Sequence, residues 1–461
     1  MVSCPSMVPL PIFQCTIYEL RFTIPRMDAE TAYNLALDYL YSFVDYSLKH
    51  ASELAKADFS LDRMFALMEA LGNPQATYPI VHIAGTKGKG SVAALCASAL
   101  TAAGYRTGLY TSPHLEDYVE RIQVDGSPLT HEGLAALVDE VKPAVARIPK
   151  LTTFEITTAI GFLAFARQNV DAAVIEVGLG GRLDATNVVT PRVSVITSLS
   201  MDHTAVLGDT LARIAGEKAG IIKEAVPVVS APQKEEALEV LLRVAREKSA
   251  PVTLVGRDVT FEAQGASLDG QEFRIQDMEF KIPLLGSYQI LNAAVAYAAL
   301  KQSGLNVSDA ALREGFSRVK WPARFEVARR EPPVVFDSAH NEDSFARLRE
   351  TLERHFPSRQ VYLILGASED KNLAGMLRVM KPLIRELIVT RADHPRALDV
   401  EKIQSAADAL EVPNEAVTPV AAALTRALEL SAKDGSIVLS AGSMFVTAEA
   451  MTAWKKMSVE S

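Results

Sequence analysis

The 461-residue chain contains only three cysteines, Cys4, Cys15 and Cys96. Their spacing matches no metal-binding motif, and three cysteines cannot form a complete disulfide framework, which suits a reducing compartment. Long apolar runs are also lacking, since no stretch reaches the roughly 18 apolar residues that span a bilayer. We therefore expect a cytoplasmic protein that does not engage a membrane, with Cys96 as a small core residue.

Positive charge is in deficit, because the chain has 47 Lys and Arg but 56 Asp and Glu, which gives a net charge of −9. This deficit argues against non-specific nucleic-acid binding, and we expect no nucleic-acid partner. The first 26 residues lack the basic start and the continuous apolar stretch of a secretory signal. Because the chain is too long for a single core, we predict a disordered extension over 1–26, a first domain over 27–320 and a second over 321–461.

A glycine-rich loop, Gly85–Ser91, follows a short apolar strand at Tyr78–Ala84 and precedes an Ala-rich helix at Val92–Ala103. In this context backbone amides and a helix N-terminus hold phosphate groups. Lys89 can reach the outer phosphates, and the Ser91 hydroxyl can help to hold Mg²⁺. The alternative is a glycine-rich turn that caps an ordinary helix. The coincidence of strand, lysines, hydroxyl and helix favours ATP binding.

Further polar residues stand where other apolar strands of this domain end. Ser112 follows the strand after the loop helix, Glu176 ends the next apolar strand, and His203 follows another. In open α/β sheets, ligands bind at the carboxyl ends of the strands. Glu176 suits Mg²⁺ coordination beside a phosphate loop, although a strand-end glutamate can also be simply solvated. A lone histidine is usually structural, but the position of His203 favours a ligand.

Lys218 lies in an Ala-, Gly- and Ile-rich segment. Apolar surroundings lower the pKa of a lysine and free the neutral amine for chemistry. The sequence alone does not separate this interpretation from a surface lysine.

The rest of the chain extends the α/β pattern. Short alternating strands over 259–282 predict a small antiparallel patch. After Trp321–Arg324 a fresh strand–helix alternation begins, with polar strand ends at Asp337, Arg391 and Ser440 facing one crevice. We therefore predict an α/β protein: an N-terminal P-loop ATPase-like domain with a mostly parallel sheet plus this patch, and a C-terminal Rossmann-like domain with a doubly wound parallel sheet.

These stretches together resemble folylpolyglutamate synthase, including its bifunctional dihydrofolate synthase form, within the Mur ligase superfamily. The resemblance covers about Leu61 to Asn341 and continues more weakly beyond. Gly90 separates the loop lysine from the hydroxyl residue, and the loop of this family likewise has a glycine at that place. The matching stretches include HIAGTKGKGS, LYTSPHLEDYVERIQVDG, VIEVGLGGRLDATNVV, MDHTAVLGDTLARIAGEKAGIIK, LLGSYQILNAAVA, WPARFE and FDSAHN.

The resemblance implies a role for each matched residue. ATP phosphates would be held by Gly88, Lys89, Gly90 and Ser91, and Mg²⁺ by Ser112, Glu176 and His203. The second-domain side would hold the nucleotide through Asn292, Arg324 and Asp337, with His340 close by. Lys218 matches a lysine that the family carbamylates, which turns an amine into an anion able to assist at the metal site. Lys89, Glu176, His203 and Lys218 are the expected catalytic set, with K⁺ as a possible further cation.

The implied reaction is amide formation driven by ATP, as in an acid–amino-acid ligase. ATP would phosphorylate a carboxylate, and the amine of L-glutamate would displace phosphate from the resulting acyl phosphate. A folate or dihydropteroate substrate would lie near Ser112, Pro113, His114, Phe154 and Glu155. Arg391 and Arg396 are candidates for binding the carboxylates of glutamate. We expect a monomer, and whether dihydropteroate is also accepted stays open.

Two other functions fit part of the pattern. A cell-wall Mur ligase would add an amino acid to a nucleotide-linked peptide, but Ser112-Pro113-His114 and Gly90 favour the folate enzyme. A P-loop switch or motor would hydrolyse ATP without an acceptor substrate, and the second complete α/β domain speaks against it.

Overall fold

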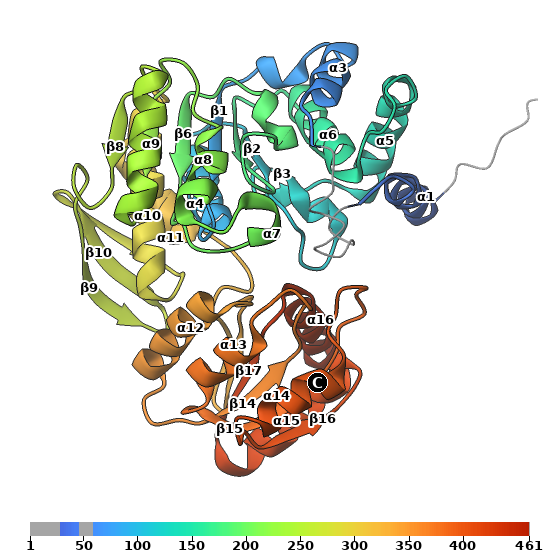
Figure 1. Ribbon diagram of the computed structural model, residues 1–461, viewed down its shortest axis with the longest axis vertical. Coiled ribbons are helices and arrows are strands. Elements are labelled where there is room, and N and C mark those ends of the chain that lie inside the picture. The colour runs from blue at the N-terminus through green and yellow to red at the C-terminus, as the bar shows by residue number, and fades with distance from the viewer. Residues whose placement is uncertain (1–27, 46–58, 461) are drawn as a thin grey trace, which may run out of the picture.

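The computed structural model describes residues 28–45 and 59–460, so the extension predicted over 1–26 lies outside the described residues (Figure 1). The N-terminal part of the chain forms the upper lobe in Figure 1, and the C-terminal part forms the lower lobe. Residues 319–325 join the lobes, between helix α11 (Asp309–Arg318) and strand β12 (Glu326–Arg330). The boundary predicted at 320/321 falls in this joining segment and stays a prediction.

The described residues of the upper lobe form an eight-stranded sheet in the order β4-β3-β2-β5-β1-β6-β7-β8. The pairs β2–β3 and β3–β4 are antiparallel, and the other neighbours are parallel. The predicted mostly parallel sheet is therefore confirmed. Its strands are β1 (Ile80–Ala84), β2 (Thr107–Tyr110), β3 (Ile122–Val124), β4 (Ser127–Pro128), β5 (Ala172–Glu176), β6 (Val193–Ile196), β7 (Val228–Ser230) and β8 (Val252–Leu254).

Helices cover both faces of this sheet, as a parallel sheet requires. Val81 and Ile83 of β1 belong to one core cluster, whereas Ile80 belongs to the cluster on the opposite face. The helices of the lobe are α1 (Ala29–Tyr41), α3 (Asp62–Ala70), α4 (Lys89–Ala102), α5 (His131–Val145), α6 (Thr153–Arg167), α7 (Thr204–Leu207), α8 (Leu211–Ala219), α9 (Glu235–Glu247), α10 (Ser287–Gln302) and α11; the short 3₁₀ helices are Pro74–Ala76, Tyr118–Arg121 and Ala185–Val188.

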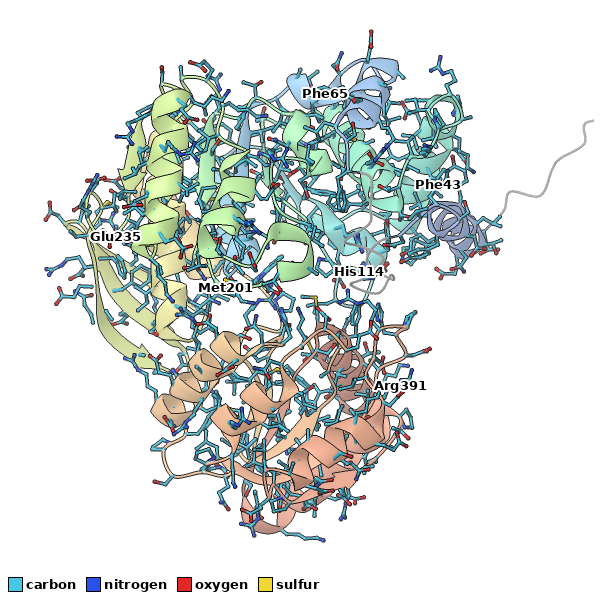
Figure 2. The ribbon with its side chains drawn as sticks, in the orientation of Figure 1. Phe43, Phe65, His114, Met201, Glu235 and Arg391 are labelled. Carbon is cyan, nitrogen blue, oxygen red and sulfur yellow. The ribbon has the colours of Figure 1, made fainter. Side chains whose placement is uncertain are left out.

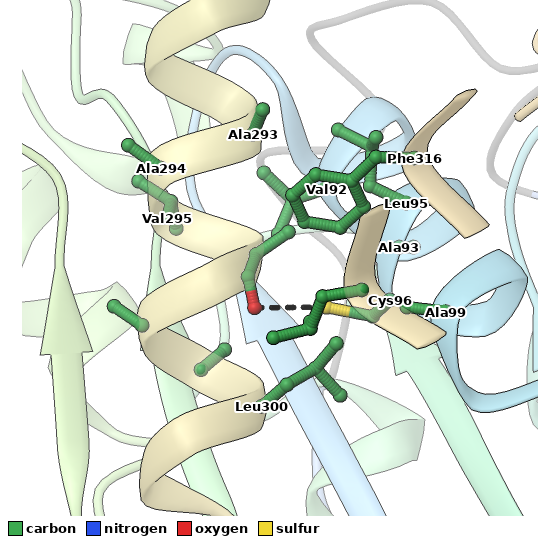
Figure 3. Packing of buried hydrophobic residues seen from close by; sticks show 14 of the residues in the cluster. Val92, Ala93, Leu95, Cys96, Ala99, Ala293, Ala294, Val295, Leu300 and Phe316 are labelled. Carbon is green, nitrogen blue, oxygen red and sulfur yellow. Dashed lines mark hydrogen bonds between the residues drawn. The ribbon is translucent and has the colours of Figure 1, made fainter. Parts of the chain in front are cut away.

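The helix after the glycine loop, α4, packs in a buried cluster that combines small residues with Leu300 and Phe316 (Figure 3). Its Cys96 is fully buried, and the Sγ atom lies 3.9 Å from the carbonyl oxygen of Ala296 on α10, which confirms the prediction of a small core residue. On α11, a Cβ added to Gly315 would lie 2.4 Å from the Cα of Ala99. The backbones of α4 and α11 therefore approach closely, and the position of the loop helix is tightly constrained.

The antiparallel patch predicted over 259–282 is also confirmed. It is a three-stranded sheet in the order β11-β10-β9, at the left of the upper lobe in Figure 1. Its strands are β9 (Phe261–Ser267), β10 (Gly270–Ile275) and β11 (Met278–Ile282). Leu268, in the β9–β10 turn, packs against a core cluster of the lower lobe, and nearby Asp269 pairs with Arg330.

The lower lobe has a six-stranded sheet in the order β12-β13-β17-β14-β15-β16. The predicted doubly wound parallel sheet is confirmed for β13, β17, β14, β15 and β16. The edge strand β12, which was not predicted, pairs antiparallel with β13. Half-exposed Glu326–Arg330 has no alternating apolar pattern to reveal a strand. The remaining elements are β13 (Pro333–Phe336), β14 (Val361–Leu365), β15 (Ile384–Val389), β16 (Asn414–Ala416), β17 (Ile437–Ala441), α12 (Glu342–His355), α13 (Leu373–Met380), α14 (Val400–Asp408), α15 (Val420–Asp434) and α16 (Met444–Glu460).

The α/β class and the two-lobed combination of sheets agree with the prediction. Among the helices in the described ranges, none has both the length and the apolar character that crossing a bilayer demands.

Candidate active site

A cavity of about 290 Å³ lies between the two lobes. The upper lobe contributes the glycine loop, the ends of β2, β5 and β6, and the start of α10. The lower lobe contributes the turn after β13 and the first turns of α12. The predicted site residues that line this cavity are Gly88, Lys89, Gly90, Ser91, Ser112, Pro113, Glu176, His203, Lys218, Asn292, Arg324, Asp337 and His340.

The glycine loop is held in place by backbone hydrogen bonds to the end of β6 and by a close contact with α10. Amides of Thr86 and Lys87 each donate to the carbonyl oxygen of Ser198, at 3.0 Å, which ties the loop to the end of β6. Gly88 has φ +87° just before α4 begins, a conformation that favours glycine. An added Cβ there would lie 2.3 Å from Oδ1 of Asn292. The loop and Asn292, about 200 residues apart in sequence, are therefore in direct contact.

Glu176, at the end of β5, is a buried carboxylate with few partners. It is 5% exposed, its Oε1 lies 3.8 Å from Nζ of Lys89, and the Ser112 amide is 3.4 Å from its Oε2. Burial raises the pKa of Glu176, and Lys89 only partly counteracts this effect. A further cation beside Glu176 would therefore stabilise its ionised form.

Lys218, on α8, is buried and is not a surface lysine. Burial, together with the nearby charge of Lys89, lowers its pKa to about 7. A substantial fraction of the amine is thus neutral near neutral pH. The structure resolves the ambiguity that the sequence left open, because Lys218 is buried and lines the cavity.

Lys87, Asp202 and Lys371 form an ionic chain that the sequence did not reveal. Asp202 lies 3.2 Å from Nζ of Lys87 in the glycine loop and 3.3 Å from Nζ of Lys371 in the lower lobe. Burial alone would raise the pKa of Asp202, but Lys87, His203 and Lys371 together lower it well below its usual range. His203, next along the chain, has φ +48° and is exposed to the cavity.

In the lower lobe, Asp337 anchors the segment that joins the lobes. Its two carboxylate oxygens accept from the amides of Phe325 and Ala339, each at 2.7 Å. His340 has Nδ1 at 2.8 Å from the carbonyl oxygen of Ser338, which makes Nδ1 the protonated nitrogen and leaves Nε2 an acceptor. Burial lowers the pKa of His340 to about 3, so the ring is neutral.

Several lining residues were not expected from the sequence. Among them are Tyr288, Gln289 and Arg347, from the starts of α10 and α12. The Nε2 atom of Gln289 is buried and has no partner among the described residues. Such an orphaned donor in a cavity wall is suited to an acceptor on a bound ligand. Gln289 stands three residues before Asn292, the i, i+3 spacing that places both on one helix face, and this was the available signal.

Five predicted substrate residues do not line the cavity: His114, Phe154, Glu155, Arg391 and Arg396. Phe154 lies directly behind it, since a Cβ on lining residue Gly178 would meet the Phe154 ring at 2.5 Å. Glu155 caps the start of α6 and pairs with Arg63 at 3.1 Å.

The other members of this group occupy different parts of the molecule. His114 lies at the lower edge of the upper lobe, whereas Arg391 lies on the side of the lower lobe (Figure 2). Nδ1 of His114 accepts from Nε of Arg121 at 2.9 Å. Arg391 and Arg396 pair with Asp399 and Asp370, at 3.4 and 2.7 Å. The glutamate-binding role of the two arginines stays a prediction.

Comparison with known proteins agrees with this architecture. The Mur ligase middle domain matches residues 83–300, and the Mur ligase, glutamate ligase domain matches residues 323–444. The chain is 35% identical over 430 residues to a dihydrofolate synthase/folylpolyglutamate synthase of Bacillus subtilis, covering 90% of this chain and 97% of the relative.

Solved structures show the same likeness. Mycobacterium tuberculosis folylpolyglutamate synthase complexed with ADP and AMPPCP matches with a TM-score of 0.84 at 35% identity, over 93% of this chain and 99% of that one. Escherichia coli FolC in complex with DHPP and ADP matches with a TM-score of 0.81 at 29% identity, over 94% and 100%. The resemblance inferred from the sequence is confirmed: the chain belongs to the dihydrofolate synthase/folylpolyglutamate synthase family of Mur ligases and is an ATP-dependent ligase.

Proposed function

We propose that this ligase adds L-glutamate to a folate through an acyl phosphate, releasing ADP and phosphate. The observation that carries the proposal is the convergence of the glycine loop, Glu176, Lys218, Asp337 and His340 on one cavity between the lobes. Phosphate-binding and carboxylate-bearing elements from both lobes can therefore act on one substrate pair.

Phosphoryl transfer is the first step. The amides of the first turn of α4 and the ammonium of Lys89 hold the phosphates of ATP, because a helix N-terminus and a lysine both favour negative charge. The substrate carboxylate attacks the γ-phosphorus, the bond from that phosphorus to the bridging oxygen breaks, and ADP leaves. Lys89 stabilises charge on the transferring group.

Amide formation follows at the activated carbon. The α-amino group of L-glutamate attacks the acyl carbon, loses a proton and displaces inorganic phosphate. Water would hydrolyse the acyl phosphate, so the site must exclude it during the reaction. Asp337, His340 and Arg324 come from the lower lobe and the joining segment. Their position lets approach of that lobe close the site.

The residues present are suited to Mg²⁺. No group of three or more His, Cys, Asp or Glu side chains in the described ranges could hold a metal alone. Mg²⁺ commonly uses only one or two carboxylates, together with substrate phosphates and waters. Glu176, Ser112 and His203 would hold it, and the under-partnered carboxylate of Glu176 supports this assignment. When bound, Mg²⁺ would neutralise charge on the phosphates. K⁺ stays a prediction.

Lys218 is proposed to carry a carbamate. Its neutral amine would add to CO₂, forming an N–C bond and releasing a proton, and the product is an anion close to the metal residues. Support comes from the burial of Lys218 and its pKa of about 7, which leaves enough free amine to react.

The decisive experiment offers the purified enzyme ATP, L-glutamate and either tetrahydrofolate or dihydropteroate. We expect a product heavier by one glutamyl residue, with equimolar ADP. With ¹⁸O in the substrate carboxylate, label should appear in inorganic phosphate, because the carboxylate oxygen becomes part of the leaving phosphate. Hydrolysis of ATP without an acceptor would instead support a nucleotide switch, and turnover only with a cell-wall precursor would support a cell-wall ligase.

We also propose that the enzyme acts as a cytoplasmic monomer. The scarcity of cysteine, three in 461 residues, supports a reducing compartment. Gel filtration with light scattering would test the monomer, and a dimeric mass would contradict it.

A further inference from the structure

Gly90 stands between Lys89 and Ser91, where the usual phosphate-loop spelling has no residue. It is the second residue of α4, and its backbone does not lie in the left-handed region that favours glycine. Inside a helix, glycine is less favourable than alanine by about 1 kcal/mol. Backbone conformation therefore gives no reason for glycine here, and the reason must lie in what surrounds it.

The indole ring of Trp321 occupies the space where a side chain at position 90 would go. A Cβ added to Gly90 would lie 2.6 Å from Cζ2 of Trp321, 3.1 Å from Cε2 and 3.3 Å from Nε1. Non-bonded carbon atoms prefer about 3.5–4.0 Å. The ring cannot easily move away, because Trp321 packs against the core cluster that contains α4 and α10.

Trp321 also lies within the segment, residues 319–325, that joins the two lobes. Two residues further on, the carbonyl oxygen of Ala323 accepts from the amide of Ser338 at 3.0 Å and from its hydroxyl at 3.1 Å. The amide of Phe325 donates to Asp337. One short stretch of chain thus touches the glycine loop at one end and the cavity wall of the lower lobe at the other.

We infer that Trp321 is a positioning residue. Its indole packs against Gly90 and couples the placement of the glycine loop to the segment between the lobes. Gly90 is needed because only a residue without Cβ lets the indole sit against the start of α4. The loop would therefore lose its alignment with the lower lobe if either partner changed. This inference rests on the proposal that the loop holds the nucleotide phosphates.

A double-mutant cycle on ADP affinity tests this contact. Gly90→Ala should weaken ADP binding about tenfold or more, because the new methyl group collides with the indole. Trp321→Leu should weaken it less. In the double variant the methyl group has room, so the ADP affinity of the double variant should return to that of Trp321→Leu alone. A double variant no better than Gly90→Ala would overturn the inference.

Matched controls separate this contact from general damage. Trp454→Leu removes the chain's other tryptophan. Combined with Gly90→Ala, it should leave ADP affinity as low as in Gly90→Ala alone. Gly265→Ala should leave ADP affinity unchanged, because its nearest neighbour would be 3.8 Å away. If Trp321→Leu does not fold, Trp321→Phe serves in its place. Rescue of Gly90→Ala by Trp454→Leu would contradict a specific contact.

Fluorescence gives a second readout, independent of affinity. In Trp454→Phe, Trp321 is the sole tryptophan of the chain. ADP should shift its emission, because the ring lies on the loop that binds phosphate. Unchanged emission at saturating ADP would count against the coupling. Lys89→Ala separates the two proposals: intact ADP binding there would refute the phosphate site itself. If Lys89→Ala loses ADP binding but Trp321→Leu does not rescue Gly90→Ala, only the role of Trp321 is refuted.

Discussion

Glu176 and Asp337 occupy corresponding places in the two lobes. Each lies at the carboxyl end of a buried strand, each is about 5–6% exposed, and each lines the same cavity. Their partners differ sharply. Asp337 accepts two amide hydrogen bonds at 2.7 Å, whereas Glu176 has one weak amide contact at 3.4 Å and a lysine at 3.8 Å.

The difference indicates two kinds of buried carboxylate. The hydrogen bonds of Asp337 are used to hold the joining segment, although burial still raises its pKa, as it does for Glu176. Glu176 keeps its oxygens available, and its burial is a cost that a bound cation would offset. Lys218 resembles Glu176 in this respect, because it too is buried with its charge poorly compensated. Glu176 and Lys218 thus keep polar atoms available for ligands, whereas both carboxylate oxygens of Asp337 already accept amide hydrogen bonds.

The largest expected effect comes from removing the cation that faces Glu176. Lys89→Ala should lower kcat/KM by about 10³-fold or more, because phosphoryl transfer depends on charge stabilisation by such groups. Steady-state assay of ADP release with folate and glutamate would measure it. Ligase activity within tenfold of the wild type would show that Lys89 does not act on the phosphates.

Replacing the carboxylate itself should be nearly as severe. In Glu176→Gln, we expect apparent Mg²⁺ affinity to fall about 10–100-fold, since a neutral amide is a poorer ligand for a hard cation. Activity measured across a Mg²⁺ titration would reveal this shift. An unchanged titration curve would place the metal elsewhere.

Lys218→Ala should lower kcat by about 10²-fold, because the proposed carbamate, an anion that would help to hold Mg²⁺, would be lost. Acetate or formate should restore part of the activity by supplying a carboxylate in the vacated space. Lys223→Ala is the matched control, a lysine five residues away that does not line the cavity and should keep full activity. A fully active Lys218→Ala enzyme would eliminate the carbamate.

The smallest effects are on stability, and they should have opposite signs in the two lobes. Asp337→Asn should lower the free energy of unfolding by about 1–3 kcal/mol, because one buried amide loses its acceptor. Ligand-free Glu176→Gln should be more stable than the wild type at pH 7, since it removes a poorly compensated buried charge. Thermal denaturation of both variants would test the contrast. Equal destabilisation of Asp337→Asn and Glu176→Gln would contradict the expected difference between the two carboxylates.

The Glu176 effect should also depend on pH in a defined direction. A raised pKa means that the folded chain binds this proton more tightly than the unfolded chain, so stability falls as pH rises above the ordinary value of 4.5. The stability advantage of Glu176→Gln should therefore grow from pH 4.5 towards pH 7. An advantage that shrinks over this range would show that the pKa is lowered instead.

Local sequence determined a large part of this protein. The strand, glycine loop and helix at 78–103, the apolar strand ending in Glu176, and the antiparallel patch at 259–282 all follow from short-range patterns. These patterns act locally, because β-branched runs, glycine turns and Ala-rich helices favour their conformations without help from distant residues. The family resemblance then linked these pieces to a ligase.

Tertiary structure decided which of these residues meet. Lys371 reaches Asp202 from the other lobe, Asn292 lies over Gly88, and Trp321 covers Gly90, although some 170 to more than 230 positions separate the members of each pair. No local pattern encodes such contacts, since they depend on how distant segments pack within the upper lobe and across the two lobes. The burial that raises the pKa of Glu176 and lowers that of Lys218 has the same origin, because desolvation is a property of the assembled fold.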